Sequence, residues 1–435
     1  MQDAMALRTS IRPTLTGLAE NGIRFTQAYA HTVCCPARAS ILTGRQPQRS
    51  GITSWTQGDM NGPKGRNMSV NEITLADVFK TEGYRTALFG KWHLGAAPDN
   101  GPTKQGFDEV FDFRNGFIDN YVHYSMHRTG FHYLYENNTE VFHRGEYFPD
   151  LITDRTLSFI ARNQNRPFFL YYALNLPHYP EQPLQRYLER YSDMPEPRRS
   201  YAAIVSTADH YIGLILSQLE ALKLTDNTII VFMSDNGFST EEYQVEVDNH
   251  LSGYPKGHKY GTSGGGGNTG HWIGSKGSFL EGGIRVPAIL SYPSKLPSGV
   301  VRDQIITGMD WFPTILELCN IPLPKGDELD GHSILPVVAD ASAPSAYSAL
   351  CMAWQNQWMA REGKWKLLFN DNGGLGGNNP KLDKIYLANL ADAQPEIRNY
   401  AKENPKTVER LTRLYEEWIK KVTPKELKNS VESLP

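Results

Sequence analysis

Residues 228–237 read TIIVFMSDNG, an apolar and β-branched run that ends in polar side chains. Residues 84–93, YRTALFGKWH, and residues 167–178, PFFLYYALNLPH, follow the same pattern. Continuous apolar runs of this length are typical of strands that are buried on both faces of a parallel sheet. We therefore predict three buried strands, each followed by residues that can carry chemistry.

Helical patterns separate these runs, and this alternation decides the fold class. Apolar residues recur at helical spacing over residues 201–222, and a shorter helical segment spans about residues 75–81. Strands that alternate with helices predict an α/β sandwich with a mostly parallel sheet. Ligands bind such sheets at the carboxyl ends of the strands. We therefore expect one shared site from the polar residues that follow the three strands: Lys91, His93, His178, Asp235 and Asn236.

The texture of the chain changes after about Asp340. Residues 354–369 look like short antiparallel strands, and residues 397–421 have the pattern of an amphipathic helix. We therefore predict a large domain over residues 1–340. A smaller carboxy-terminal subdomain, with a short antiparallel sheet and a helix, is expected over residues 341–435.

Composition and charge exclude several classes of partner. The 435 residues carry 44 Lys and Arg against 47 Asp and Glu, so the net charge of -3 gives no electrostatic case for nucleic acid or an anionic membrane. The longest apolar runs are strand-sized, far short of the ~20 residues that a membrane span needs. The four cysteines lack the spacing of a zinc cluster.

Residues 34–45 read CCPARASILTGR and contain the expected nucleophile. They resemble the signature of the formylglycine-dependent sulfatases, Cys-x-Pro-(Ser/Ala)-Arg-x-x-x-x-Thr-Gly-Arg. Only Cys34 has proline two residues on and arginine four residues on, so Cys35 takes the variable position. Pro36 is preset for a first helical turn. We therefore expect Cys34 at a helix amino terminus, where backbone N–H groups favour an anion.

Five further segments resemble the same family in the same order. Each is weak alone, because a lone histidine is more often structural and a lone lysine is usually a solvated charge. Their joint occurrence carries the argument, and it implies an alkaline phosphatase-like α/β/α sandwich over nearly the whole chain from about Pro13. The segments are residues 90–95 (GKWHLG), 176–178 (LPH), 234–237 (SDNG), 276–287 (KGSFLEGGIRVP) and 310–314 (DWFPT).

The resemblance implies hydrolysis of sulfate esters, on sulfated carbohydrates or aryl sulfates. In the family a maturation enzyme oxidises the signature cysteine, here Cys34, to formylglycine, whose hydrate attacks sulfur and then expels sulfate. Arg38 would help to hold this hydrate. Asp235 and Asn236, with the matured Cys34, would bind a divalent cation, typically calcium.

The resemblance also implies roles for four residues that would touch the sulfate ester. Lys91 and Lys276 would bind sulfate oxygens and stabilise the charge that develops in transfer. His178 would donate a proton to the leaving alcohol, and His93 would take a proton from the second hydroxyl. Both roles call for a pKa near neutral, which histidine ordinarily has.

The chain departs from the family at its amino terminus. Members open with a strand that ends in an Asp-Asp pair, and both aspartates bind the metal. Residues 12–22, RPTLTGLAENG, resemble the segment that follows this pair, and nothing before them reads as an apolar strand. We therefore expect poor metal binding and weak or no activity. Inside the sheet we expect unpaired backbone groups and an exposed apolar groove.

A truncated gene and a naturally shortened, inactive relative both explain this departure. Truncation would also explain why residues 1–10 lack the charged and apolar regions of a signal peptide. In that case the family implies a periplasmic or secreted protein.

Two alternative functions stay open on the sequence. The same fold and signature serve some phosphonate and phosphate ester hydrolases, and the absent aspartates allow a non-catalytic binding protein. The aromatic-rich residues 117–135, which include His123, His127 and His132, form either the rim of a sugar site or a packed insertion.

Overall fold

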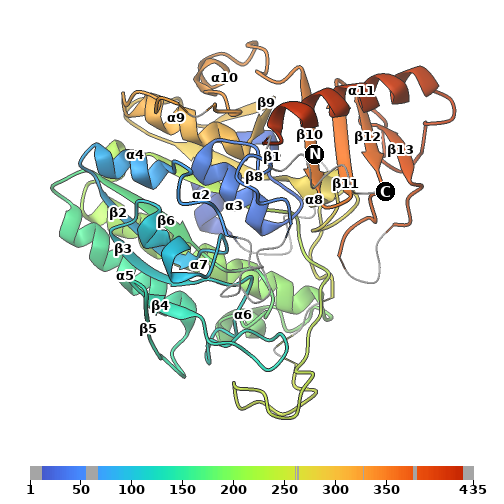
Figure 1. The fold of residues 1–435 in the computed structure, drawn as a ribbon. Coiled ribbons are helices and arrows are strands. Elements are labelled where there is room, and N and C mark those ends of the chain that lie inside the picture. Colours follow the sequence, from blue (N-terminus) through green and yellow to red (C-terminus); the bar gives the residue numbers. More distant parts are fainter. Residues whose placement is uncertain are drawn as a thin grey trace.

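The computed structural model describes residues 12–54, 67–259, 261, 264–326, 328–375 and 380–424. Helices cover the central strands, and the carboxy-terminal sheet, orange to red, lies beside them at the upper right (Figure 1). The helices are α2 (Pro13–Glu20), α3 (Cys34–Thr43), α4 (Leu75–Thr81), α5 (Phe148–Asn163), α6 (Gln185–Arg190), α7 (Arg198–Ala221), α8 (Glu281–Ile284), α9 (Trp311–Leu318), α10 (Leu335–Ala339) and α11 (Pro405–Val422), with 3-10 turns η1 (Pro98–Asn100), η2 (Pro102–Lys104), η3 (Thr225–Asn227) and η4 (Gly308–Asp310).

The central strands form two sheets that mix parallel and antiparallel pairs. One has the order β7 (Ile230–Met233), β8 (Arg285–Ser291), β1 (Ile23–Tyr29) and β9 (Val300–Thr307), and β1 runs parallel to β9. The other has the order β5 (Thr139–Glu140), β4 (Leu134–Glu136), β3 (Glu109–Phe113), β2 (Arg85–Lys91) and β6 (Phe168–Ala173). In it β2 runs parallel to both β3 and β6. The α/β fold class is confirmed.

Local sequence explains where the helices near the site begin and end. Thr74 and Asp77 form a capping box that starts α4, because each side chain accepts a hydrogen bond from the other's backbone N–H. Gly44 ends α3 in the left-handed region at φ 68°, which glycine adopts without strain. The helix expected over residues 201–222 is α7, which begins three residues earlier.

Among the described residues, the two strands that flank the middle of the fold have no partner strand on one edge. Both β6 and β7 are end strands, and their residues are mostly half-buried. A cavity of about 1870 Å³, which we call the strand groove, is lined by residues 166–179 on one side and 227–239 on the other. The expected exposed apolar groove is therefore confirmed. Alternate side chains of β6 pack on two core clusters, so both of its faces are covered as predicted, and the partial exposure of β6 and β7 comes from the edge that faces the groove.

The carboxy-terminal strands form a separate antiparallel sheet, as expected. Its order is β10 (Ala349–Trp354), β11 (Gln357–Glu362), β12 (Trp365–Phe369) and β13 (Ile385–Asn389). Helix α11 packs on it, with Leu411 fully buried and the ring of Tyr415 stacked on Trp358. The helix begins at Pro405 rather than near residue 397, since proline is favoured in a first helical turn. None of the helices described has the length and apolarity to cross a membrane.

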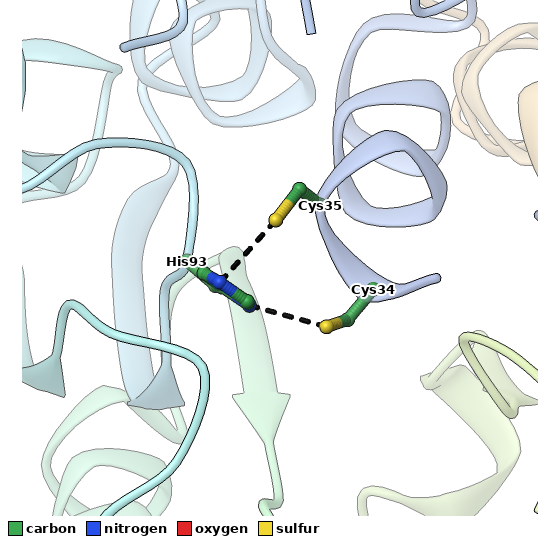
Figure 2. Close-up of side chains that lie close together, drawn as sticks. All are labelled: Cys34, Cys35 and His93. Atoms are coloured by element: carbon green, nitrogen blue, oxygen red, sulfur yellow. Dashed lines mark hydrogen bonds between the residues drawn. The ribbon is translucent and has the colours of Figure 1, made fainter. Parts of the chain in front are cut away.

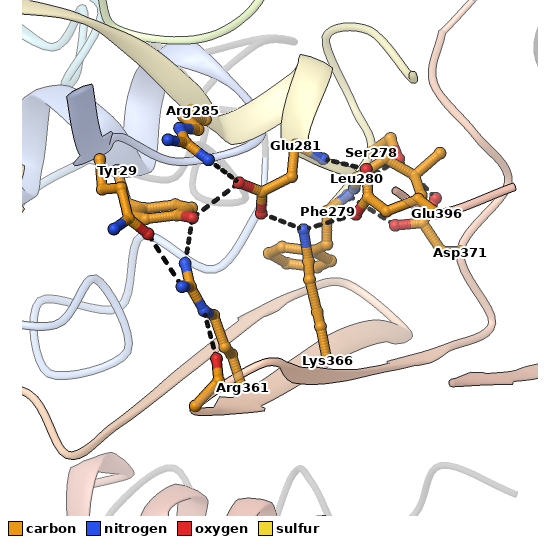
Figure 3. Close-up of polar contacts among 12 residues, drawn as sticks. Tyr29, Ser278, Phe279, Leu280, Glu281, Arg285, Arg361, Lys366, Asp371 and Glu396 are labelled. Atoms are coloured by element: carbon orange, nitrogen blue, oxygen red, sulfur yellow. Dashed lines mark hydrogen bonds and ion pairs between the residues drawn. The ribbon is translucent and has the colours of Figure 1, made fainter. Parts of the chain in front are cut away.

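A buried polar cluster, which we call the junction network, joins this sheet to the rest of the molecule (Figure 3). Lys366 on β12 lies 2.8 Å from Glu281 and 2.9 Å from Glu396, and all three side chains are inaccessible to solvent. Arg361 on β11 bonds to the hydroxyl of Tyr29, which in turn donates to Glu281 at 2.7 Å. The network thus ties β12 and β11 to the segment that follows Lys276.

Candidate active site

Cys34 lies at the start of α3, as its neighbour Pro36 predicts. The thiol is buried, and Sγ lies 3.2 Å from Nδ1 of His93. His93 follows β2 in the left-handed region, at φ 59°, a conformation that costs a non-glycine residue energy and often marks a functional site. Cys35 lies 3.3 Å from the other ring nitrogen, Nε2. The imidazole is therefore held between two thiols (Figure 2).

These three side chains come close enough to suggest a metal centre, but the ring orientation argues against one. Their ligand atoms lie within 4.8 Å of one another. However, Cys34 faces Nδ1 and Cys35 faces Nε2, so the two sulfurs lie at different nitrogens of the ring. A single ion bound to one ring nitrogen would therefore be close to only one of the two sulfurs. The arrangement instead suits a nucleophile next to a base.

The charges around Cys34 favour an anion at its position. Its thiol pKa is held well below the usual range, first by the hydrogen bond with Cys35 and then by Lys91 and His93, against the opposing effect of burial. Burial lowers the pKa of His93 to about 4, so at neutral pH the ring is uncharged and able to accept a proton. In the matured protein the oxygens of formylglycine would take the place of this sulfur.

Arg38 and Asp235 form a partly buried ion pair on the wall of the strand groove. Both Nε and Nη2 of Arg38 donate to Oδ2 of Asp235, at 3.0 and 2.8 Å, and Nη1 donates to the carbonyl of Lys91. Burial alone would raise the pKa of Asp235, but the charge of Arg38 lowers it. Asn236 follows, and its Oδ1 is buried without a hydrogen-bond partner among the described residues.

A glycine fixes this turn against the segment that carries the second lysine. The amide of Gly237 donates to the carbonyl of Gly283 at 2.8 Å. A Cβ atom at Gly237 would lie 1.9 Å from the carbonyl oxygen of Gly282, so only glycine fits. This contact explains the glycine of the SDNG segment, whereas Cβ atoms at Gly282 and Gly283 would meet carbonyl oxygens of residues 273–278.

Lys276 and His178 meet on the wall opposite Cys34. Lys276 Nζ lies 2.9 Å from His178 Nε2 and 2.6 Å from Glu241 Oε2. Burial, followed by the charges of Lys276 and Lys91, lowers the pKa of His178 to about 3. A pocket of about 160 Å³ is lined by Cys34, His93, Gly116, Phe117, His178, Glu241, Tyr243, Lys276 and Leu375.

The structure thus brings the expected residues together at two adjoining cavities. Cys34, His93, His178 and Lys276 line the small pocket. The side chains of Arg38, Lys91, Asp235 and Asn236 line the strand groove, and His178 and Lys276 line both cavities. Their catalytic and metal-binding roles stay predictions.

Four residues of the pocket were not predicted as part of it: Gly116, Glu241, Tyr243 and Leu375. Glu241 and Tyr243 come shortly after the SDNG segment, but in sequence they look like ordinary loop residues. Leu375 belongs to the carboxy-terminal subdomain, and no local sequence pattern indicates that it lines the pocket. Phe117 begins the aromatic-rich stretch, and its ring stacks on His178 with centroids 5.4 Å apart. His123, by contrast, is fully buried, so the stretch is partly wall and partly packed insertion.

The oxygen donors present test whether the site suits calcium. The unpartnered Oδ1 of Asn236 and the carboxylate of Asp235 are ligands of the kind that calcium prefers. Yet Arg38 already takes one carboxylate oxygen, and calcium binds six to eight oxygens. The described residues fit a cation in kind but provide fewer oxygens than calcium binds.

Comparisons with known proteins agree with this geometry. The family model described as Sulfatase matches residues 3–321. The chain is 32% identical to Uncharacterized sulfatase YdeN of Escherichia coli (strain K12), over 75% of this chain and 57% of that protein. It is also 32% identical to N-acetylgalactosamine-6-sulfatase of Canis lupus familiaris, over 75% of this chain and 61% of that protein. The chain therefore spans less than two thirds of the length of these two relatives.

A solved structure extends the likeness to nearly the whole fold. Ps i-CgsB in complex with k-i-k-neocarrahexaose matches with a TM-score of 0.77 and 26% identity, over 94% of this chain and 87% of that chain. The match includes the carboxy-terminal residues, since it extends beyond the family model. The chain belongs to the sulfatase family.

Proposed function

We propose that this chain forms the catalytic core of a sulfuric ester hydrolase whose nucleophile is formylglycine made from Cys34. One observation carries the proposal. Cys34 faces His93 at the start of α3, across a pocket whose other wall holds Lys276 and His178. A nucleophile, a base, a proton donor and a cation thus surround one space of the size of a small anion.

The residues of the pocket divide the chemistry among them. Formylglycine, as its hydrate, supplies one hydroxyl that attacks sulfur and a second that expels sulfate. Lys276 and Lys91 offset the negative charge that builds up on the sulfate oxygens. His178 gives its proton to the ester oxygen as the bond to sulfur breaks. His93, uncharged at neutral pH, takes the proton of the second hydroxyl.

His178 has to gain its acidic proton when the substrate binds. In the unliganded pocket its pKa is about 3 rather than near neutral, because it is buried beside Lys276 and Lys91. A bound sulfate ester brings negative charge next to the ring, and an opposite charge within 4–6 Å favours the protonated form. We therefore propose that substrate binding itself charges the acid.

We further propose that the substrate is a sulfated carbohydrate. The name of the N-acetylgalactosamine-6-sulfatase relative specifies an amino sugar that carries sulfate, and Ps i-CgsB binds k-i-k-neocarrahexaose. In this chain Phe117 lines the pocket, and its ring stacks on His178 and Tyr243.

Matched esters test the reaction. We expect the matured protein to hydrolyse p-nitrophenyl sulfate and sulfated monosaccharides faster than p-nitrophenyl phosphate or a phenylphosphonate ester. The activity should depend on co-expression with the maturation enzyme. Faster turnover of the phosphate or phosphonate ester would instead support the alternative hydrolase, and no turnover with no metal affinity would support a binding protein.

A strand added upstream tests the metal site. We propose that an extension carrying an apolar strand that ends in Asp-Asp pairs with the open edges of β6 and β7, which places carboxylates beside Asp235. Calcium affinity and activity should rise together, because calcium draws its affinity from carboxylates. An extension ending in Asn-Asn is the matched control and should restore the sheet without the affinity. Tight calcium binding and full activity in the 435-residue chain would contradict this part of the proposal.

A further inference from the structure

Lys91, which lines the strand groove, and Lys276, which also lines the pocket, differ in one respect. Lys91 and Lys276 are both 2% exposed, and burial disfavours the charged form of each. Burial lowers the pKa of Lys91, as expected for a desolvated ammonium. The pKa of Lys276 is raised, because the charge of Glu241 outweighs the opposing effect of burial. The second lysine thus has a carboxylate partner of its own, 2.6 Å away.

Glu241 is itself held in place. Ser239 Oγ donates to its Oε2 at 2.7 Å, and the Tyr243 hydroxyl donates to its Oε1 at 2.5 Å. The charge of Lys276, followed by that of His178, overcomes the burial of the carboxyl and lowers the pKa of Glu241 to about 2. The carboxylate is therefore charged throughout the physiological range and fixed in one position.

The contact continues from Lys276 to His178. Nδ1 of His178 lies 2.6 Å from the carbonyl oxygen of Tyr179, and a carbonyl can only accept, so Nδ1 carries the hydrogen. The unprotonated Nε2 then accepts from the ammonium of Lys276 at 2.9 Å. Glu241, Lys276 and His178 form one hydrogen-bonded series that ends at the wall of the pocket.

We propose that Glu241 is a positioning residue, which holds Lys276 in place and ammonium-charged beside His178. Its role in sulfate ester hydrolysis rests on the proposed function above. Of the other charges that act on Lys276, those of Cys34 and Asp235 also favour the ammonium, with smaller effects than that of Glu241, whereas the charge of Lys91 opposes it. Without Glu241, Lys276 would be a buried lysine whose pKa is lowered by burial, as that of Lys91 is.

The first test measures Lys276 directly and needs no activity. Selective 13C labelling of lysine, with the signal assigned by Lys276→Arg, reports the pKa of Lys276 by NMR titration. Glu241→Gln keeps the shape and removes the charge, so we expect a downward shift of about one to three units. Glu241→Asp should restore part of it. Glu242→Gln is the matched control, since this neighbour is exposed and pairs with Lys259, and should leave Lys276 unchanged.

An unchanged Lys276 pKa in Glu241→Gln, or an equal shift in Glu242→Gln, would overturn the proposal. If Glu241→Gln does not fold, Tyr243→Phe and Ser239→Ala remove the bonds that hold the carboxylate and should shift Lys276 in the same direction. No shift in a folded form of either variant would also overturn it.

The second test separates positioning from catalysis. In the matured protein, Glu241→Gln should move the basic limb of the kcat/KM profile to lower pH, because Lys276 loses its proton earlier, and Glu241→Asp should move it back. An unmoved basic limb in an active Glu241→Gln variant would contradict the positioning role. A wild-type chain without sulfatase activity would refute the proposed function and leave the NMR result standing.

Discussion

The junction network and the catalytic pocket are both buried clusters of charge, and they are built differently. In the junction network Lys366 bonds to two carboxylates, Glu281 and Glu396, and Arg361 and Tyr29 complete the contacts (Figure 3). In the pocket and the adjoining groove, Arg38, Lys91 and Lys276 face the carboxylates of Asp235 and Glu241, and the buried Oδ1 of Asn236 has no partner among the described residues.

The difference separates a structural cluster from one that awaits ligands. A saturated network fixes one arrangement of the chain, and removing any member leaves a buried charge unpaired. The pocket and the adjoining groove contain a buried oxygen ligand that has no partner among the described residues, and they gain their remaining partners from an anion and a cation in solution. Mutations in the first should therefore change stability, and mutations in the second should change turnover.

The largest expected effect is on turnover at Cys34. Cys34→Ala removes the precursor of the nucleophile, so sulfate ester hydrolysis by the matured protein should fall to the uncatalysed level. The thiol lies at a helix start and contacts the polar ring of His93 rather than an apolar core cluster, so the temperature of thermal unfolding should change little. Measurable turnover in Cys34→Ala would rule out the formylglycine mechanism.

Next in size is the loss of stability at Lys366. Lys366→Met leaves Glu396 buried without its cation and Glu281 with Arg285 as a remaining partner, and we expect the free energy of unfolding to fall by about 3–5 kcal/mol, measured in denaturant. Arg398→Met is the control, since its pair with Glu403 is exposed, and it should change stability little. If the two mutations lowered the free energy of unfolding equally, the junction network would be no more important for stability than a surface ion pair.

Alanine at either pocket lysine should affect turnover and spare the fold. Lys91→Ala and Lys276→Ala each remove one donor to the sulfate oxygens, and kcat should fall by about 10²–10³, the cost of one lost oxyanion donor. Steady-state kinetics with p-nitrophenyl sulfate measures the change, and circular dichroism checks the fold. A large loss of stability without a specific loss of kcat would place these lysines in the structural class instead.

The smallest effect is on the acid side of the stability profile. The pKa of His178 is about 3 in the folded chain and 6.5 in the unfolded reference, so the unfolded state binds the proton first as pH falls. The stability linked to this ring is present above pH 6.5 and is lost as pH falls from 6.5 towards 3. His178→Gln should therefore lose less stability than the wild type between pH 7 and pH 5. An identical loss in both would show that His178 is protonated in the folded pocket.

The sequence predicted most of the central strands and helices, because hydrophobic periodicity and composition are properties of short segments of chain. The apolar runs that became β2, β6 and β7, and the helix that became α7, were placed within three residues. The residues expected at the site also converge, and most of them end or follow a strand or lie in the first turns of α3, whereas Lys276 comes from a loop. Their spacing along the chain is what a short motif records.

Long-range contacts were the part that local patterns do not contain. Glu241 becomes part of the pocket because its loop folds back and brings its carboxylate to Lys276. Leu375 lines the same pocket but belongs to another subdomain. The low pKa of His178 likewise results from burial beside two lysines that lie far from it in sequence. The half-buried state of β6 and β7 depends on the strand groove between them, which the apolar runs themselves do not reveal.

Peptide mass spectrometry of the chain made with a formylglycine-generating enzyme tests the central claim most directly. The tryptic peptide that contains both cysteines should carry formylglycine at Cys34 and an unmodified thiol at Cys35. This follows from the register of Pro36 and Arg38, and from the position of Cys34 at the start of α3 facing His93. Modification at Cys35, or sulfate ester hydrolysis by protein whose Cys34 is still a thiol, would contradict the account.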